Sequence, residues 1–276
     1  MRSMPELPEV ETVRRMVSPH IIGRTVENIF VYNDKVLAFP NPDTFITRIT
    51  SRRFTHSSRR GKFLLFHMEG NYRLVLHLRM TGCLLATSCD HPAEPHTHVV
   101  FHLDDGTELR YSDVRRFGRF WLLGPDDPDI TGMSELGPEP HDEIVTGDYL
   151  YRAFTNRNRT VKECLLDQHI IAGIGNIYSD EILHSSGILP FRRSSDLSLE
   201  ECDVLSRNIK TDIHFFLDMN AISDEDYVAG RGKDYRNTPY LRVYGRSGKP
   251  CLLCGGILLK TVVGQRGSVY CPRCQH

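Results

Sequence analysis

The sequence predicts an α+β protein with an N-terminal β-sandwich and its leading helix, a helical second domain and a C-terminal β-hairpin. Three observations lead to this prediction. Apolar and polar residues alternate in short runs over residues 25–123, apolar residues recur at helical spacing over residues 149–216, and two CxxC pairs close the chain. With 276 residues, 40% of them hydrophobic, the chain is long enough for two globular domains, and its composition excludes disordered and fibrous proteins.

The first predicted element is a helix over residues 7–18, because Val10, Val13 and Val17 recur at helical spacing after a turn rich in Pro and Glu. Short strands follow, and the sequence Asp-Asp-Gly at residues 104–106 is typical of a hairpin turn. The predicted strands cover residues 26–31, 63–68, 73–78, 98–103, 107–111 and 117–123.

The second half of the chain is predicted to be helical after a linker rich in Pro, Gly and acids at residues 124–147. An apolar turn at residues 170–176 contains glycines that allow close backbone approach. It either presents amides to a phosphate or is a plain helix–helix turn. The polar stretch 220–239 is predicted to be a mobile loop. The predicted helices cover residues 149–154, 161–166, 176–185 and 198–216.

These elements divide the chain into three predicted domains, 1–130, 149–230 and 231–276, with a linker at 131–148. No uncharged run approaches the roughly 18 apolar residues that span a bilayer, and three glutamates lie among the first twelve residues. We therefore expect no signal peptide, no membrane contact and a cytoplasmic protein.

The net charge of −1 conceals a strong asymmetry along the chain. Residues 231–276 hold nine basic side chains and one acid, a net charge of +8, whereas the remainder holds 25 basic and 34 acidic side chains, a net charge of −9. Basic residues also cluster at residues 52–62 and 110–119. A basic tail and local basic clusters indicate binding to a phosphate backbone.

The basic tail carries two CxxC pairs sixteen residues apart, formed by Cys251, Cys254, Cys271 and Cys274. Such pairs suit a tetrahedral thiolate zinc site whose intervening residues form a hairpin. Disulfides are the alternative, but they do not persist in the reducing compartment expected here. We predict one structural Zn²⁺.

Three histidines at alternate positions suggest a second metal site: His96, His98 and His102. Alternate residues of a strand share one face of the sheet. Histidines that form hydrogen bonds within a sheet are commoner, so we predict no metal there.

Four motifs spread over the chain carry a family resemblance. They are MPELPEVET at residues 4–12, RRGKF at 59–63, GNIY at 175–178 and CPRCQ at 271–275. Together they resemble the formamidopyrimidine-DNA glycosylase and endonuclease VIII family over essentially the whole chain. HLRM at 77–80 and VRRFG at 114–118 are similar to the formamidopyrimidine branch. The resemblance implies a catalytic sandwich, a helix-two-turn-helix domain and a zinc finger preceded by a lesion-binding loop, with DNA in a cleft between domains.

The opening motif supplies an amine and carboxylates. An α-amino group titrates at about pH 8, so more of it is free base than for a lysine. The resemblance implies that Pro5 attacks C1′ of the damaged nucleotide, expels the base and forms a Schiff base, which permits β- and then δ-elimination. It also implies that Glu6 acts as general acid and base and that Glu9 positions the sugar. Pairing with the helix dipole is the alternative for both carboxylates.

The resemblance also implies a set of DNA contacts. Lys62, Asn176 and Arg266 would hold the phosphates that flank the lesion, although a solvated surface lysine is the alternative for Lys62. Side chains at wedge positions would fill the space left by the rotated base, although two of them otherwise resemble core hydrophobes. The implied DNA-binding residues are Lys62, His77, Met80, Arg115, Phe117, Asn176, Tyr244 and Arg266.

Two features depart from the family pattern. The residues Met-Arg-Ser precede Met4, and Arg2 blocks methionine removal, which leaves the Pro5 nitrogen acylated and unreactive. We expect that translation starts at Met4, or that residues 1–3 are an artificial addition or are trimmed after synthesis. Otherwise the protein binds damaged DNA without cutting it. Residues 219–223, MNAIS, replace a Gly-Gly-Ser/Thr-Thr segment. The substrate is therefore open between 8-oxoguanine, formamidopyrimidines, oxidised pyrimidines and a bulky adduct.

Taken together, the resemblance predicts a bifunctional DNA glycosylase and AP lyase of base-excision repair. Its partner would be damaged double-stranded DNA, its oligomeric state a monomer and its only cofactor zinc, and it would be associated with the nucleoid while working. A zinc-ribbon protein that acts on protein partners is a further alternative, which predicts no preference for damaged duplex.

Overall fold

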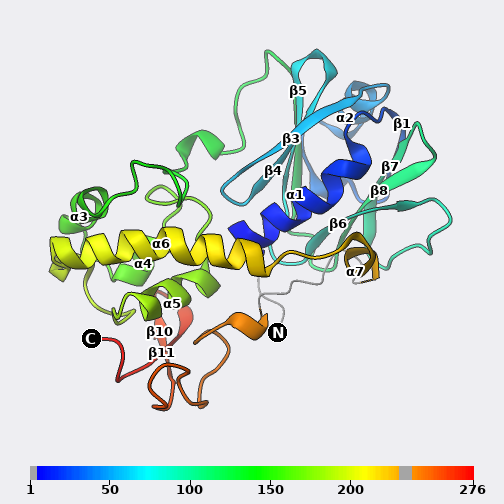
Figure 1. The fold of residues 1–276 in the computed structure, drawn as a ribbon. Coiled ribbons are helices and arrows are strands. Elements are labelled where there is room, and N and C mark those ends of the chain that lie inside the picture. Colours follow the sequence, from blue (N-terminus) through cyan, green and yellow to red (C-terminus); the bar gives the residue numbers. More distant parts are fainter. Residues whose placement is uncertain (1–4, 230–237) are drawn as a thin grey trace. The chain divides into compact units, whose positions relative to one another are not determined.

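The computed structural model describes residues 5–229 and 238–276, which form two compact units (Figure 1). The first, the sandwich unit, contains residues 5–134 and 220–229. The second, the helical unit, contains residues 135–219 and 238–276. No helix among the described residues is long and apolar enough to cross a membrane.

The sandwich unit consists of two β-sheets, as predicted. One sheet has the strand order β1-β7-β8-β6 and the other β2-β9-β5-β4-β3. Within both sheets the neighbouring strands are antiparallel, except that β2 runs parallel to β9. The strands are β1 (Val26–Val31), β2 (Leu37–Phe39), β3 (Phe54–Arg60), β4 (Phe63–Met68), β5 (Tyr72–His77), β6 (Gly82–Ser88), β7 (Thr97–Leu103), β8 (Thr107–Asp113) and β9 (Arg119–Leu123).

Helix α1 (Leu7–Ile21) packs on this sandwich and is longer than predicted. The sequence predicts an end at residue 18, the residue before Pro19. Proline removes only one N–H, however, and the N–H of Ile22 still donates to Ser18 O at 3.0 Å. Burial of Ile21 extends the helix by a further turn. Its apolar stripe in the sandwich core is Val10, Val13, Val17 and Ile21.

Several elements of the sandwich unit were not predicted. Strand β3 has the sequence FTHSSRR, which shows no apolar alternation, yet β3 pairs with β4 along its length. Helix α2 (Pro42–Ile49) follows Asn41, whose side chain accepts the N–H of Thr44 at 3.0 Å. Short 3₁₀ turns also occur in both units: η1 (Asp34–Val36), η2 (Glu69–Asn71), η3 (Met133–Glu135), η4 (Ser194–Asp196) and η5 (Thr238–Tyr240).

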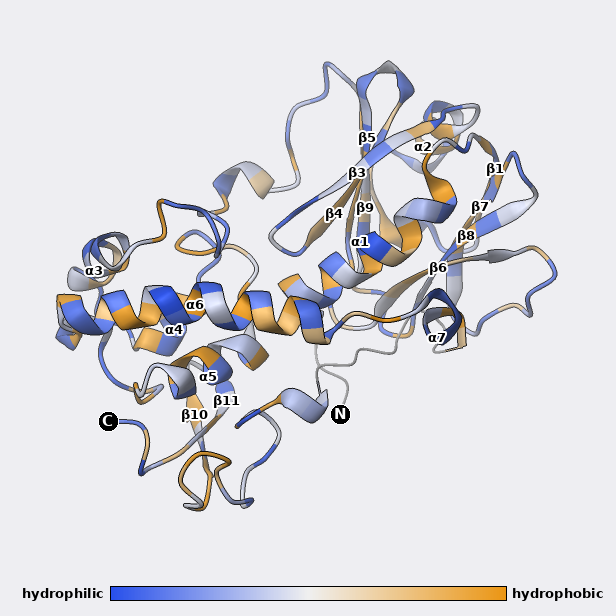
Figure 2. Cartoon of the chain, in the orientation of Figure 1, coloured by the Kyte–Doolittle hydropathy of each residue, from blue (hydrophilic) through white to orange (hydrophobic). Residues whose placement is uncertain are grey.

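The helical unit confirms the four predicted helices. Helix α6 packs against α3 and α5, and Figure 2 shows apolar and polar residues alternating along α6, as expected for an amphipathic helix. The helices are α3 (Gly147–Thr155), α4 (Val161–Leu166), α5 (Asn176–Ser185) and α6 (Leu199–Met219).

The segment after α6 differs from the predicted mobile loop. Asn220 is fully buried, and its Nδ2 donates to Thr12 Oγ1 on α1 at 2.9 Å. Helix α7 (Asp224–Ala229) follows, and the ring of Tyr227 lies in the sandwich core, where its hydroxyl donates to Leu84 O at 2.6 Å. Packing on the sandwich therefore orders a sequence that is polar overall. The rest of the predicted loop, residues 230–237, lies outside the described residues.

The chain ends in the predicted hairpin. Strands β10 (Leu259–Val263) and β11 (Arg266–Tyr270) are antiparallel, with Val263 opposite Arg266. The two residues between them, Gly264 and Gln265, have φ of 51° and 62°. Positive φ at both positions is the requirement of a type I′ turn, which matches the twist of a two-residue hairpin.

Candidate functional site

The start of α1 buries three of the predicted catalytic residues. Pro5 is buried, and Glu6 and Glu9 are each 1% exposed. Glu6 is the N-cap of the helix, and its backbone N–H donates to Glu9 Oε2 at 2.8 Å as part of a capping box. The positive end of the helix stabilises carboxylates at this position. Two carboxyl groups, one and four residues after Pro5, are thus held away from water.

Lys62 lies in the turn between β3 and β4 and is only 7% exposed, so it is not the solvated surface lysine of the alternative interpretation. Gly61 adopts a φ of 54°, in the left-handed region that glycine accepts without strain. The guanidinium of Arg59 donates to Gly61 O at 2.8 Å. The turn that carries the lysine is therefore fixed by its own backbone conformation and by a side-chain bond.

His77, at the end of β5, is a neutral hydrogen-bond donor. Burial, followed by the positive charges of Arg79 and Lys62, lowers the pKa of His77 to about 3. Its Nδ1 accepts the backbone N–H of Arg79 at 3.0 Å. The ring proton of the neutral imidazole is consequently on Nε2, which is the nitrogen left to donate.

Met80, Arg115 and Phe117 lie together on two loops of the sandwich unit, residues 78–81 and 114–118. The guanidinium carbon of Arg115 is 4.7 Å from the ring centroid of Phe117, and its Nη1 is 2.9 Å from the sulfur of Met80. Phe117 is 47% exposed, so it is not a core residue. An exposed ring beside a thioether and a cation suits insertion into a base stack.

In the helical unit, the turn over residues 170–176 leads into α5. Gly173 has a φ of 89°, and its N–H donates to Gln168 Oε1 at 2.9 Å. Asn176 is the first residue of α5, and its Nδ2 donates to Gly267 O at 3.0 Å. The neighbouring Arg266 is exposed at the start of β11. Asn176 and Arg266, both implied by the resemblance to hold phosphates, therefore lie on adjoining elements.

Two buried acids of α5, which the sequence analysis did not identify, hold the C-terminal segment. Asp180 accepts Lys162 Nζ at 2.6 Å and the N–H of Val269 at 2.9 Å. Glu181 accepts three consecutive backbone N–H groups, among them that of the predicted DNA contact Tyr244 at 2.8 Å. The sequence of α5, NIYSDEILHS, gives no signal that these two acids are buried.

The four cysteines of the two CxxC pairs converge at the base of the hairpin. Their sulfur atoms all lie within 4.8 Å of one another. The Sγ–Sγ distances are 3.5 Å for Cys254 and Cys271 and 3.9 Å for Cys251 and Cys274. Tetrahedral Zn²⁺ with bonds of about 2.3 Å separates its sulfur ligands by about 3.8 Å. This donor set fits one structural zinc ion, which ties the ends of the hairpin together.

Two of the three histidines at alternate positions make contacts within the sheet of the sandwich unit. His98 Nε2 forms a hydrogen bond with Asp113 O at 2.8 Å, and His102 lies 3.3 Å from Glu108. Within residues 5–229 and 238–276, the four cysteines are the only cluster of three or more metal-ligating side chains.

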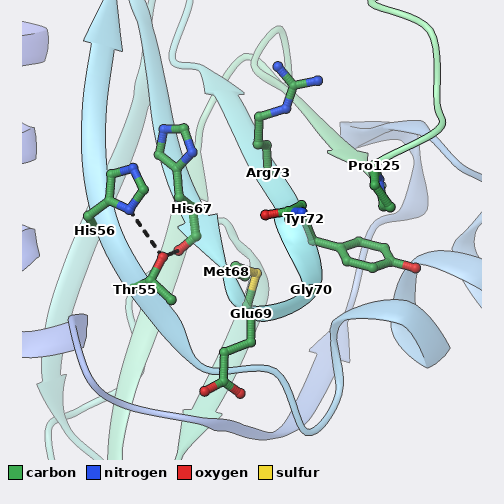
Figure 3. A pocket seen from close by; sticks show the side chains of 10 residues that line it. Thr55, His56, His67, Met68, Glu69, Gly70, Tyr72, Arg73 and Pro125 are labelled. Carbon is green, nitrogen blue, oxygen red and sulfur yellow. Dashed lines mark hydrogen bonds between the residues drawn. The ribbon is translucent and has the colours of Figure 1, made fainter.

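A pocket of about 460 Å³ occurs elsewhere on the sandwich unit, around the turn between β4 and β5 (Figure 3). The imidazole rings of His56 and His67 stack there with centroids 3.9 Å apart, and Thr55 forms a hydrogen bond with His56 at 3.1 Å. None of the predicted site residues lines this pocket. The candidate site therefore consists of helix and loop termini rather than of this cavity.

Comparison with known proteins identifies the family. Three family domains match: the formamidopyrimidine-DNA glycosylase N-terminal domain at residues 4–120, the formamidopyrimidine-DNA glycosylase H2TH domain at 136–228, and a zinc finger found in FPG and IleRS at 248–276. A formamidopyrimidine-DNA glycosylase of Desulforamulus reducens is 42% identical over 99% of both chains, and one of Moorella thermoacetica is 43% identical over 91% of this chain and 92% of that protein. This chain belongs to the formamidopyrimidine-DNA glycosylase family.

Solved structures of the formamidopyrimidine-DNA glycosylase family share the fold. Lactococcus lactis Fpg in complex with DNA containing an abasic site has a TM-score of 0.90 and 30% identity, covering 98% of this chain and 99% of that chain. The same protein in complex with FAPY-dG DNA has a TM-score of 0.89 and 30% identity, covering 98% of this chain and 100% of that chain.

The predicted site residues of this DNA glycosylase fall in all three matched domains. Pro5 to Phe117 lie in the first, Asn176 in the second, and Arg266 with the four cysteines in the third. Tyr244 lies between the second and third matched ranges. The interpretation as a zinc ribbon with protein partners is therefore not supported, because the zinc finger is one of three domains of a formamidopyrimidine-DNA glycosylase.

Proposed function

We propose that this chain removes oxidised bases from damaged duplex DNA and then cleaves the strand as an AP lyase. The observation that carries the proposal is the start of α1, where Pro5, Glu6 and Glu9 are buried together. A secondary amine next to two shielded carboxylates is suited to attack on a sugar carbon with proton transfer to the ring oxygen. Membership in the family supports the assignment.

In the first step the nitrogen lone pair of Pro5 forms a bond to C1′. The bond between C1′ and the base breaks, and the base leaves with its electron pair and takes up a proton, which balances the proton that the Pro5 nitrogen releases. Glu6, as the carboxylic acid, then gives its proton to O4′ as the sugar ring opens, and the product is an iminium Schiff base. Glu9, fixed by its bond to the Glu6 amide, positions the sugar.

In the second step the iminium acts as the electron sink. A base, for which Glu6 as carboxylate is the candidate, removes a proton from C2′, and β-elimination expels the 3′ phosphate. A further elimination expels the 5′ phosphate, and hydrolysis releases the sugar remnant from Pro5. Each departing phosphate carries away the electrons of its broken bond, so no redox cofactor is required.

The DNA contacts proposed for the sandwich and helical units follow from the family resemblance. Lys62, Asn176 and Arg266 would hold phosphates, which gives affinity that is independent of sequence and falls with salt. Met80, Arg115 and Phe117 would fill the gap left by the rotated base. The Nε2 donor of His77 and the backbone-anchored Tyr244 would make additional contacts.

The proposed substrates are formamidopyrimidines and 8-oxoguanine. The curated relatives are named for formamidopyrimidine excision, and Lactococcus lactis Fpg has been solved with FAPY-dG DNA and also with DNA containing an oxidised pyrimidine. Oxidised pyrimidines are therefore the second substrate class to test. The rates of base excision from matched duplexes, each with one of these lesions, rank the substrate preferences of the protein.

The proposal is tested with a pair of proteins that have identical side chains from Pro5 onward. One begins at Pro5, with its N-terminus verified by mass spectrometry, and the other retains residues 1–4, which acylate the nitrogen. Both are incubated with an abasic-site duplex and borohydride, which reduces a Schiff base to a stable cross-link. We expect a cross-link on Pro5 only in the first protein and lesion binding in both.

A cross-link in both proteins would show that Pro5 is not the nucleophile. Lesion binding with a cross-link in neither would refute the lyase and leave a sensor of damaged DNA. Glu6→Gln in the protein that begins at Pro5 separates the roles further. It should slow base removal by about 10²-fold or more, the usual contribution of a general acid or base, while binding is retained.

A further inference from the structure

The two loops that carry Met80, Arg115 and Phe117 meet at one buried carboxylate, Asp113. This residue ends β8, directly before the 114–118 loop, and is 1% exposed. In the sheet it lies opposite Gly82, the first residue after the 78–81 loop. One side chain is thus placed between two loops that are more than thirty residues apart in sequence.

Every acceptor position of this carboxylate faces a donor from the loops or from β8. Oδ1 accepts the hydroxyl of Thr81 and the backbone N–H of Arg115, the latter at 3.1 Å. Oδ2 accepts the hydroxyl of Tyr111 at 3.0 Å and the backbone N–H of Gly118 at 2.9 Å. Asp113 therefore fixes both ends of the 114–118 loop and ties it to Thr81, the residue after Met80.

The space around this carboxylate is filled. A Cβ added to Gly118 would lie 1.8 Å from the hydroxyl of Tyr111, and one added to Gly82 would lie 2.9 Å from it. Non-glycine residues in both loops adopt left-handed backbone, with φ of 54° at Arg79 and 59° at Arg116. Such conformations persist only where the surroundings determine them. The loops are thus held in one arrangement.

We propose that Asp113 is a positioning residue that sets Met80, Arg115 and Phe117 in register for insertion into the DNA stack. This inference rests on the proposed function, because it takes these three side chains as the wedge. Insertion of groups from two loops into one gap requires that the loops keep a fixed relative position. Loops that are ordered only on binding lose affinity to the entropy of ordering.

The variant Asp113→Asn tests this role with almost no change of shape. If the new NH₂ group occupies the Oδ1 position, it faces the N–H of Arg115; if it occupies the Oδ2 position, it faces the N–H of Gly118. In the first orientation the N–H of Arg115 keeps only Thr81 Oγ1, at 3.1 Å, as acceptor; in the second the N–H of Gly118 loses its acceptor Asp113 Oδ2. Thr81→Val removes the two hydroxyl bonds that link the loops, one to Asp113 Oδ1 and one from the N–H of Arg115. The matched control is Glu108→Gln, a buried carboxylate on the same strand that bonds Arg110 rather than the loops.

The measurement follows insertion rather than cleavage, so it does not depend on the state of the Pro5 nitrogen. The full-length, zinc-loaded chain is titrated into a duplex with a stable abasic-site analogue and 2-aminopurine as the opposite base. Insertion unstacks the fluorophore and raises its emission. An undamaged duplex measures phosphate binding alone, and a thermal melt of each variant measures folding.

We expect the wild type and Glu108→Gln to give the same fluorescence rise. Asp113→Asn should weaken binding to the lesion duplex by at least about tenfold, the scale of one lost bond to a charged group. It should also reduce the rise at saturation, with binding to undamaged duplex unchanged within twofold. Thr81→Val should also weaken binding to the lesion duplex and reduce the fluorescence rise, but by less. This second variant keeps the test valid if Asp113→Asn fails to fold.

Three outcomes overturn the inference in distinguishable ways. If Arg115→Ala and Phe117→Ala abolish the fluorescence rise but Asp113→Asn and Thr81→Val leave it intact, the wedge stands and Asp113 does not position it. If the two alanine variants behave like the wild type, the wedge assignment in the proposed function is wrong and the inference falls with it. Equal losses on damaged and undamaged duplex would indicate a structural role only.

Discussion

Replacement of Asp180 by Asn should release the zinc hairpin from α5. Lys162 and Asp180 are both 0% exposed, and Nζ lies 2.6 Å from Oδ1. The same carboxylate accepts Ser268 Oγ at 2.6 Å and the N–H of Val269 at 2.9 Å, both on β11. The substitution leaves a buried ammonium without its anion and presents an NH₂ group to a donor.

Removal of one partner from a buried ion pair costs about 3–5 kcal/mol. A loss of 3 kcal/mol corresponds to about a 10²-fold increase in the opening equilibrium of the hairpin, because each 1.4 kcal/mol is a factor of ten. Hydrogen exchange measured by mass spectrometry on peptides from β10 and β11 reports this local opening directly. Exchange in peptides that contain the Val269 amide, whose acceptor is Asp180 Oδ2, should accelerate most.

The matched control is Asp148→Asn, which breaks an ion pair with Arg152 at 3.9 Å whose side chains are 64% and 80% exposed. That change should cost under about 0.5 kcal/mol. Adding Lys162→Met to the Asp180 variant removes the orphaned charge and should restore part of the protection. An acceleration of less than threefold in the Asp180 variant would refute the claim that this pair holds the hairpin.

Three further predictions concern pH, packing and zinc. Burial opposes ionisation of Glu11, but its bond to Arg14 prevails and lowers the pKa of this carboxyl below its usual value. Its stabilisation is therefore present at neutral pH and lost as pH falls through the lowered pKa, so Glu11→Gln should flatten the acid limb of urea-unfolding stability. Tyr227→Phe removes the bond to Leu84 O and should cost about 1–3 kcal/mol of unfolding free energy, whereas Tyr32→Phe, at 69% exposure, should change it by less than about 0.5 kcal/mol. Chelation of zinc should abolish exchange protection in the hairpin and weaken binding to damaged and undamaged duplex alike, and added Zn²⁺ should restore both.

Periodicity predicts an element when the element buries its own apolar face. Helix α5 was predicted at its observed bounds, and the strands 26–31 and 63–68 likewise, because their apolar residues face a core. Strand β3 was missed because its backbone bonds come from β4 and its side chains are largely polar. Tyr227 was missed because one buried ring orders α7, and a single aromatic residue in a polar stretch has no period.

Likewise, only part of the candidate site could be predicted from the sequence. The CxxC spacing predicted the zinc site from donor chemistry alone, whereas the roles predicted for Pro5, Glu6 and Glu9 came from the resemblance. The wedge side chains followed only from resemblance, because nothing in the sequence shows that Phe117 is exposed while Phe120, three positions later, is fully buried.

The acids that organise both units could not be predicted, and they share one physical arrangement. Asp113 in the sandwich unit and Glu181 in the helical unit each accept several backbone N–H groups from segments outside helices and sheets. Loop amides have no ladder partner, and a buried carboxylate satisfies two or more of them with charge-assisted bonds. In sequence such an acid is indistinguishable from a surface residue, because its burial is created by the loops it binds. A protein that deforms its ligand, as proposed here for duplex DNA, must present its side chains from loops that keep a fixed position. The buried acids fix such loops, and one of these loops carries the exposed cation Arg115.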